Sequence, residues 1–363
     1  MKKLYFLITF FIFNFFFSQT DYVLKMKFNE KYFISSFIRN NTKNEFVLAA
    51  IRKADFTTQN SLNYNYVNIL DSVLKNEFRI SEKERLSMSD LERKQHDSIS
   101  VELKNGSLLG LYKKLVQAYY GSEFLEKTLH DSGIENFKIT QTDYNKFSIS
   151  FISKENLEKT KTIFKKNRLS FHESLDEKEL ENIQNCLMKE NDVMVKNNYL
   201  KKEKNYLLIY KDDVQLFGDS YKKSKCFDTE KITFLLDYGE DSNVFSKLFF
   251  VKQSNNLENN LVNSIIGFNI SFKQNKEIYK DNYFYLSIYL NDSGKENSSE
   301  ISEQNIGKKL FTSTNAEFVS NLKISSKIQN GILISGNLFE ENWQTLSEIV
   351  KFEVFRNSLK INN

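Results

Sequence analysis

An apolar run at the start of the chain is the sequence feature that most strongly constrains the fold and location of the rest. Residues 4–17, LYFLITFFIFNFFF, form an apolar run without a charged side chain, broken by Asn14, and follow a short basic start. From Ser18 onward the sequence turns polar at once. This three-part layout is typical of a secretory signal sequence. We therefore expect residues 1–19 to be a signal peptide, cut near Ser18 and Gln19, and the protein to be exported.

A retained N-terminal membrane anchor is the alternative interpretation of the same run. A helix that spans a bilayer needs about 20 apolar residues, and residues 4–17 fall short of that length. No later stretch of the sequence is apolar over a spanning length. The remaining chain is therefore expected to be a periplasmic or secreted domain without membrane helices of its own.

Composition and charge place the remaining chain among globular proteins. Hydrophobic residues make up 40% of the sequence and charged residues 27%, a balance typical of folded domains. The formal net charge is +4, too small to favour nucleic acid or anionic lipid as a partner of the chain as a whole. The sequence contains no proline, so its turns must be built from Asn, Asp, Gly and Ser.

Hydrophobic periodicity predicts an α+β fold. The first part of the chain indicates the order βαββαβ, which is the ferredoxin-like pattern. Its predicted strands are Asp21–Phe28, Phe137–Thr142, Lys146–Ile152 and Leu169–Leu175, with helices before Gly133 and over Glu155–Arg168. We predict a ferredoxin-like base over residues 21–175, completed by a strand near 355–361.

The character of the sequence changes at about residue 176. After a helical stretch come short strand-like runs separated by loops rich in Asn, Lys and Asp. A hairpin is expected around Asn315-Ala316, and a helix over Glu340–Phe352 contains the only tryptophan, Trp343. We predict a mostly β head over residues 176–352, inserted into the base.

The two cysteines, Cys186 and Cys226, admit two interpretations. In an oxidising periplasm they could form a disulfide. They could equally be two free or buried thiols, because spacing along the chain does not show whether the two Cβ vectors meet.

The sequence shows no arrangement typical of an enzyme. The three histidines, His96, His130 and His172, lack metal-ligand spacing. The nucleophile, zinc-protease, phosphate-loop and dinucleotide motifs are missing. We therefore expect no catalytic residues, no metal, no cofactor and no small-molecule substrate.

Three stretches of the chain together resemble a known family. The strongest is C-terminal: Asn305-Ile306-Gly307-Lys308 precedes a hairpin, Ile334-Ser335-Gly336-Asn337 follows it, and after a helix the chain closes on Leu359-Lys360-Ile361. The other two are Gly133–Ser174 and, more weakly, Asp21–Ala54. Their order and spacing are similar to the first periplasmic domain of SecD, the protein-export membrane protein that also occurs fused as SecDF.

This resemblance implies a function in binding. The family's domain consists of a base and a head and is implicated in holding a translocating polypeptide outside the export channel. It therefore implies an unfolded or translocating polypeptide as partner, together with the Sec export channel. The chain departs from the family in lacking its membrane helices and in reading Phe151-Ile152-Ser153 where the family has Leu-Pro-Gly. The alternative is a diverged relative that binds another envelope or surface partner and has no part in secretion.

Overall fold

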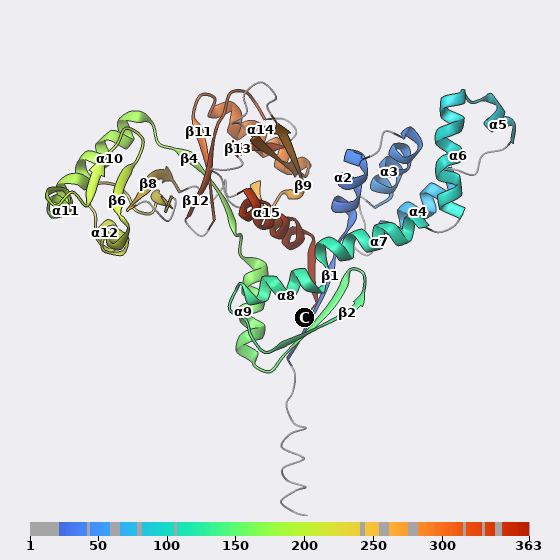
Figure 1. The fold of residues 1–363 in the computed structure, drawn as a ribbon, viewed down its shortest axis with the longest axis horizontal. Helices are drawn as coiled ribbons and strands as arrows, with labels where there is room; N and C mark the ends of the chain where they lie inside the picture. The colour runs from blue at the N-terminus through green and yellow to red at the C-terminus, as the bar shows by residue number, and fades with distance from the viewer. Residues whose placement is uncertain are drawn as a thin grey trace, which may run out of the picture. The chain divides into compact units, whose positions relative to one another are not determined.

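The protein is an α+β protein built as two compact units (Figure 1). One unit comprises residues 1–166 with 358–363, and the other residues 167–357. The computed structural model describes residues 22–41, 44–58, 66–77, 82–104, 107–239, 244–253, 261–274, 282–314, 317–328, 331–337 and 343–362. The predicted signal peptide and its cleavage site at Ser18 and Gln19 lie outside these residues. None of the helices formed by the described residues is long and apolar enough to cross a membrane.

The first unit contains a four-stranded sheet with the order β14-β1-β3-β2, in which every neighbouring pair is antiparallel. Its strands are β1 (Tyr22–Phe28), β2 (Phe137–Asp143), β3 (Lys146–Phe151) and β14 (Leu359–Asn362). Its helices are α2 (Lys31–Asn41), α3 (Glu45–Thr57), α4 (Tyr66–Glu77), α5 (Glu82–Ser87), α6 (Asp90–Lys104), α7 (Ser107–Tyr120), α8 (Ser122–His130) and α9 (Lys154–Lys165).

This sheet is covered on one face. Along β1, Leu24, Met26 and Phe28 are buried while the residues between them are exposed or half-exposed. Strand β3 alternates in the same way, and α8 and α9 contact the sheet. Because successive side chains of a strand point to opposite faces, the helices bury one face and leave the other open to solvent.

A buried carboxylate joins three parts of the first unit. Glu30, just after β1, is fully buried. It accepts hydrogen bonds from the hydroxyl of Tyr144 and the side-chain amide of Asn145, each at 2.7 Å, and from the backbone N–H of Val67 at 3.3 Å. A buried charge is tolerated only when it is hydrogen-bonded in this way. Glu30 thereby fixes the β2–β3 turn and the start of α4 against the end of β1.

The predicted strand Leu169–Leu175 does not belong to the first unit. It forms β4 (Leu169–Ser174), which pairs with β11 and β8 in the second unit. The place beside β1 is taken by β14, which begins at Leu359 because residues up to Ser358 are helical. The prediction was wrong about this strand because alternation reports that a strand has a buried face and does not report which sheet it joins.

The second unit contains two sheets. Its strands are β4, β5 (Leu200–Lys202), β6 (Leu207–Tyr210), β7 (Ile232–Asp237), β8 (Phe245–Lys252), β9 (Ile265–Gln274), β10 (Asn282–Leu290), β11 (Lys309–Thr314), β12 (Glu317–Lys323) and β13 (Ile332–Asn337). Its helices are α10 (Glu177–Glu190), α11 (Asp192–Lys196), α12 (Val214–Tyr221), α14 (Asp292–Gln304) and α15 (Trp343–Ser358). The head was predicted to be mostly β, and the structure shows that it also contains several helices.

The larger sheet runs β4-β11-β12-β7-β8-β6-β5, and an additional pairing of β4 with β8 closes its first strands into a ring. Leu235, Phe249, Val251 and Phe311 form one apolar cluster on these strands, with Phe318 packed against it. The smaller sheet has the order β13-β10-β9 and is antiparallel throughout.

A second buried carboxylate lies where the chain enters and leaves this unit. Glu353 on α15 is fully buried and accepts hydrogen bonds from the backbone N–H groups of Arg168 and Leu169, at 2.5 and 3.0 Å. Its other oxygen accepts from Arg356 at 2.7 Å. The guanidinium of Arg168 lies 3.9 Å from the ring centre of Phe352. These contacts hold the start of β4 against the last turns of α15.

Replacing Glu353 by glutamine should destabilise the second unit by about 3 kcal/mol, because it leaves the buried Arg356 without its countercharge. Urea unfolding followed by fluorescence of Trp343 measures the change. Glu348→Gln, an exposed position earlier on the same helix, is the matched control and should change stability by less than about 0.5 kcal/mol. Equal effects of the two substitutions would contradict the role given to Glu353.

Candidate functional site

The residues Asn305-Ile306-Gly307-Lys308 form the turn between α14 and β11. The side chain of Asn305 is buried and donates to the carbonyl of Ile301 at 2.9 Å, while Lys308 donates to its amide oxygen at 3.0 Å. Gly307 has a φ of 88°, which favours glycine. The side chain of Ile306 is exposed. Three of the four residues therefore shape a turn, which gives them a structural role.

The residues Ile334-Ser335-Gly336-Asn337 are the last four of the six residues of β13 and pair with Leu286, Tyr285, Phe284 and Tyr283 of β10. Gly331, just before the strand, has a φ of 144°, and a Cβ there would lie 2.3 Å from the carbonyl oxygen of Ile288. The predicted motif thus marks a strand that runs very close to its neighbour.

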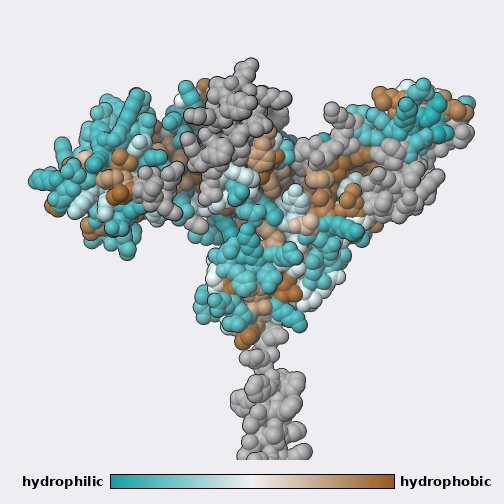
Figure 2. All heavy atoms as spheres, in the orientation of Figure 1, coloured by the Kyte–Doolittle hydropathy of each residue, from teal (hydrophilic) through white to brown (hydrophobic). Residues whose placement is uncertain are grey.

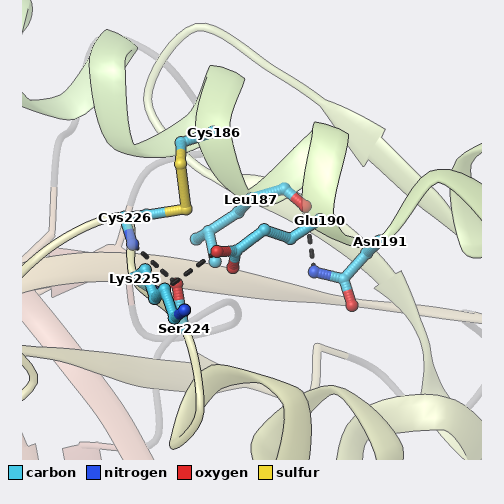
Figure 3. Close-up of a disulfide and its surroundings, with 7 residues drawn as sticks. All are labelled: Cys186, Leu187, Glu190, Asn191, Ser224, Lys225 and Cys226. Carbon is cyan, nitrogen blue, oxygen red and sulfur yellow. Dashed lines mark hydrogen bonds between the residues drawn. A yellow bond between two sulfur atoms is a disulfide. The ribbon is translucent and has the colours of Figure 1, made fainter.

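Cys186 and Cys226 are joined by a disulfide (Figure 3). Cys186 lies on α10, and Cys226 follows α12. Glu190, one turn after Cys186, accepts a hydrogen bond from the backbone N–H of Lys225 at 3.1 Å. The loop that carries Cys226 is therefore held to α10 by one covalent bond and one hydrogen bond.

The same three side chains could in principle serve as metal ligands. The two sulfurs and a carboxylate oxygen of Glu190 lie within 4.8 Å of one another. Sulfur binds metals as a thiolate, and the disulfide occupies both sulfurs. In the bonded state the cluster fastens a loop and offers a metal a single carboxylate.

The three histidines occupy separate places. His96 is buried on α6, 3.3 Å from Asp97, whose carboxylate also accepts two hydrogen bonds from Arg85. His172 is buried on β4, with Nε2 2.9 Å from the hydroxyl of Ser313. The ring of His130, at the end of α8, packs against that of Phe137. Each histidine thus contacts its own local neighbours and none of them shares a cluster with another.

Strand β9 is the feature best suited to binding another chain. It is ten residues long and pairs along its length with β10. Among the described residues no strand pairs with its other side. The outward N–H and C=O groups of such an edge can pair with an added strand. The edge therefore offers backbone hydrogen bonds that depend little on the sequence of the partner.

An apolar row follows the same edge. Phe268, Ile270 and Phe272 share one face of β9 because strands have a period of two residues. Phe268 and Ile270 are half-buried, whereas Phe272 is 55% exposed. The ring of Phe272 meets that of Trp343, at the start of α15, edge to face with 5.0 Å between ring centres. We call β9 together with Phe272 and Trp343 the aromatic edge.

No family model matches this chain, and no curated protein matches it. One similar solved structure is described as SecDF, a membrane component that enhances protein export; it is 13% identical, with a TM-score of 0.28 over 66% of this chain and 88% of that one. Another is SecDF in a super-membrane-facing form, 14% identical, with a TM-score of 0.23 over 66% of this chain and 26% of that one. The motif resemblance to SecD thus has no support from sequence comparison, and structural likenesses this weak carry no argument about function.

The sequence did not identify the aromatic edge, although two signals of it were present. Gly267–Phe272 was predicted as a strand, and Trp343 stood out as the only tryptophan. Neither signal shows that β9 lies at the edge of its sheet or that Phe272 meets a residue seventy positions later, since both depend on long-range packing.

Breaking the disulfide should destabilise the second unit. The bond links residues 40 apart in sequence, and the loss of loop closure in the unfolded chain corresponds to about 4 kcal/mol. Thermal unfolding with and without reductant measures it. The double variant Cys186→Ser/Cys226→Ser should unfold early in both conditions, and a stability of the natural protein that is indifferent to reductant would refute the prediction.

The carboxyl of Asp97 should titrate far below its ordinary value. Hydrogen bonds from Arg85, and then from His96, lower its pKa from 3.8 to about 2. Because the folded pKa is the lower one, this contribution to stability is present above about pH 4 and is lost as pH falls through about 2. An NMR titration of the Asp97 carboxyl measures its pKa. Arg85→Gln should raise the pKa toward 3.8, and an unchanged value would contradict this cause.

Proposed function

We propose that this protein binds unfolded or translocating polypeptide as a non-enzymatic accessory of protein export, and that the aromatic edge is the binding site. The observation that carries the proposal is β9, a long strand whose outer side pairs with no described strand. An extended peptide that adds to a sheet edge gains main-chain hydrogen bonds whatever its sequence. A protein that receives many different unfolded chains needs this kind of contact.

The side chains of the aromatic edge supply the second requirement. Unfolded chains expose apolar residues, and Phe272 and Trp343 offer aromatic surface beside the side of β9 that pairs with no described strand. Aromatic side chains are prominent among residues that dominate binding energy. The row continues inward through Ile270 to the buried Leu286 of β10. Phe272 is thus the exposed end of an apolar ladder, so it is held in place before any partner arrives.

The proposal includes the finer features that the SecD resemblance implies. We propose a ferredoxin-like base with β14 as its last strand, which the strand order β14-β1-β3-β2 with helices in both crossovers supports. Residues 1–19 act as a signal peptide and deliver the chain to the periplasm or outside the cell. The Sec export channel is the proposed neighbour, and no nucleic acid or small-molecule substrate takes part.

The test uses site-specific photo-crosslinking in intact cells. A photoreactive amino acid at Phe272 should capture many newly exported chains and the export channel. The same amino acid at Phe56, a position on α3 that is 79% exposed, is the matched control and should capture few. Capture of a single folded envelope or surface protein at Phe272 would contradict the proposal and favour the diverged-relative alternative.

The substitution Phe272→Lys should weaken binding of a reduced, alkylated model polypeptide by about tenfold or more, because it removes an aromatic contact and places a charge on the edge. Fluorescence anisotropy of the labelled polypeptide measures affinity. Phe56→Lys should leave the affinity unchanged, since that residue lies in the other unit. Equal losses in the two variants would show that the effect is not specific to β9.

A further inference from the structure

We propose that the open face of the four-stranded sheet in the first unit docks on an anionic lipid surface. The face carries five lysines, which we call the lysine face: Lys25, Lys27, Lys138, Lys146 and Lys360. They come from all four strands of the sheet. This inference concerns a different unit from the aromatic edge and does not depend on it.

The strand register brings these lysines together. Lys27 lies directly opposite Lys146 of β3 and directly opposite Lys360 of β14. Residues opposite one another in an antiparallel pair point to the same face, with Cβ atoms about 5 Å apart. Lys25 lies one row along, opposite Ser148. Lys138 lies one row further, opposite Ser150.

The fold itself gives no reason for this arrangement. Like charges directly opposite one another destabilise a sheet. Lys146 forms an ion pair with Asp143 at 3.3 Å, but the other four lysines make no ion pair or hydrogen bond with any described side chain. The row Lys146-Lys27-Lys360 therefore costs stability. A negatively charged partner would offset that cost.

Apolar residues beside the lysines indicate a lipid rather than a purely polar anion. Val23 shares the face with Lys25 and Lys27 and is 45% exposed. Ile152, immediately after β3 and near the start of β1, is 53% exposed. Lipid surfaces accept both kinds of group, because apolar side chains enter the interface while lysines bind anionic headgroups.

The sequence before β1 points to the same partner. Only residues 18–21 separate β1 from the apolar run 4–17. Four residues reach about 14 Å at most. If the apolar run is retained as a membrane anchor, the alternative to a cleaved signal peptide, the start of β1 is consequently held near the bilayer surface.

Figure 2 shows hydrophilic side chains over much of the visible surface of the described residues. The sequence contains 51 Lys and Arg and 47 Asp and Glu residues, so the net charge of the whole chain is only +4. The lysine face differs because five cations share one sheet face with a single acid at its border. Its attraction is therefore local and should weaken with rising salt.

Vesicle co-sedimentation of the full-length chain tests the proposal. Vesicles of phosphatidylglycerol mixed with phosphatidylcholine are compared with vesicles of phosphatidylcholine alone, so that any binding by residues 4–17 is common to both. We expect the ratio of binding to anionic over neutral vesicles to fall about a hundredfold in the triple variant Lys27→Gln/Lys146→Gln/Lys360→Gln. Each lysine contributes a factor of about five, and the three factors multiply.

The matched control removes the same charge elsewhere in the first unit. Lys83→Gln/Lys94→Gln/Lys114→Gln changes three exposed helical lysines and should retain the preference for anionic vesicles. An equal loss in both triple variants would show an effect of net charge alone and overturn the proposal. Equal binding of the natural protein to both kinds of vesicle would overturn it as well.

Stability gives an independent readout. The triple substitution on the lysine face relieves repulsion between opposed lysines, so it should leave the melting temperature unchanged or raise it while lipid binding is lost. A lowered melting temperature accompanied by lost binding would mean that the lysines support the fold, and would overturn the assignment of this face as a docking surface.

Discussion

A buried carboxylate on α15 joins the first strand of the second unit to its last helix. Glu353 accepts hydrogen bonds from the backbone N–H groups of Arg168, just before β4, and Leu169, its first residue, and pairs with Arg356 on its own helix. The start of β4 is thereby fixed, and β4 in turn pairs with β11 and β8 to close the ring of the larger sheet. The same helix ends at Ser358, directly before β14 pairs with β1. The sheet of the first unit is thus completed by a strand that follows the whole second unit in the sequence.

Both proposed binding surfaces are parts of sheets that the fold leaves uncovered. A sheet has two faces and two edges, and a chain of this size covers only some of them. In the second unit the proposed surface is the outer side of β9, which pairs with no described strand, with Phe272 and Trp343 beside it. In the first unit it is a whole face, and its row of opposed lysines costs stability. Neutral backbone and aromatic rings suit an unfolded chain, whereas clustered cations suit an anionic surface.

Local pattern predicted local structure well. The alternation in Phe147, Ile149 and Phe151 identified β3, and the hairpin that β2 and β3 form is present. The α+β class was confirmed on the same basis. The strand expected near 355–361 is present in the first sheet as β14, whereas Leu169–Ser174 was assigned to that sheet wrongly, because only long-range pairing shows which sheet a strand joins. The spacing of the family motifs singled out Asn305–Lys308. The structure shows that these residues form a turn with a buried side-chain amide.

The sequence alone determined the apolar start of the chain, the periodicity of its strands and the inventory of groups available for chemistry, because each of these is a property of neighbouring residues. It also set the number of lysines and cysteines, but not which residues lie beside them in the fold. Only the tertiary structure decided that Cys186 lies against Cys226, that Lys27 faces two further lysines, and that β9 stands at an edge. These relations join residues distant along the chain, and the free energy that selects them comes from packing the whole fold.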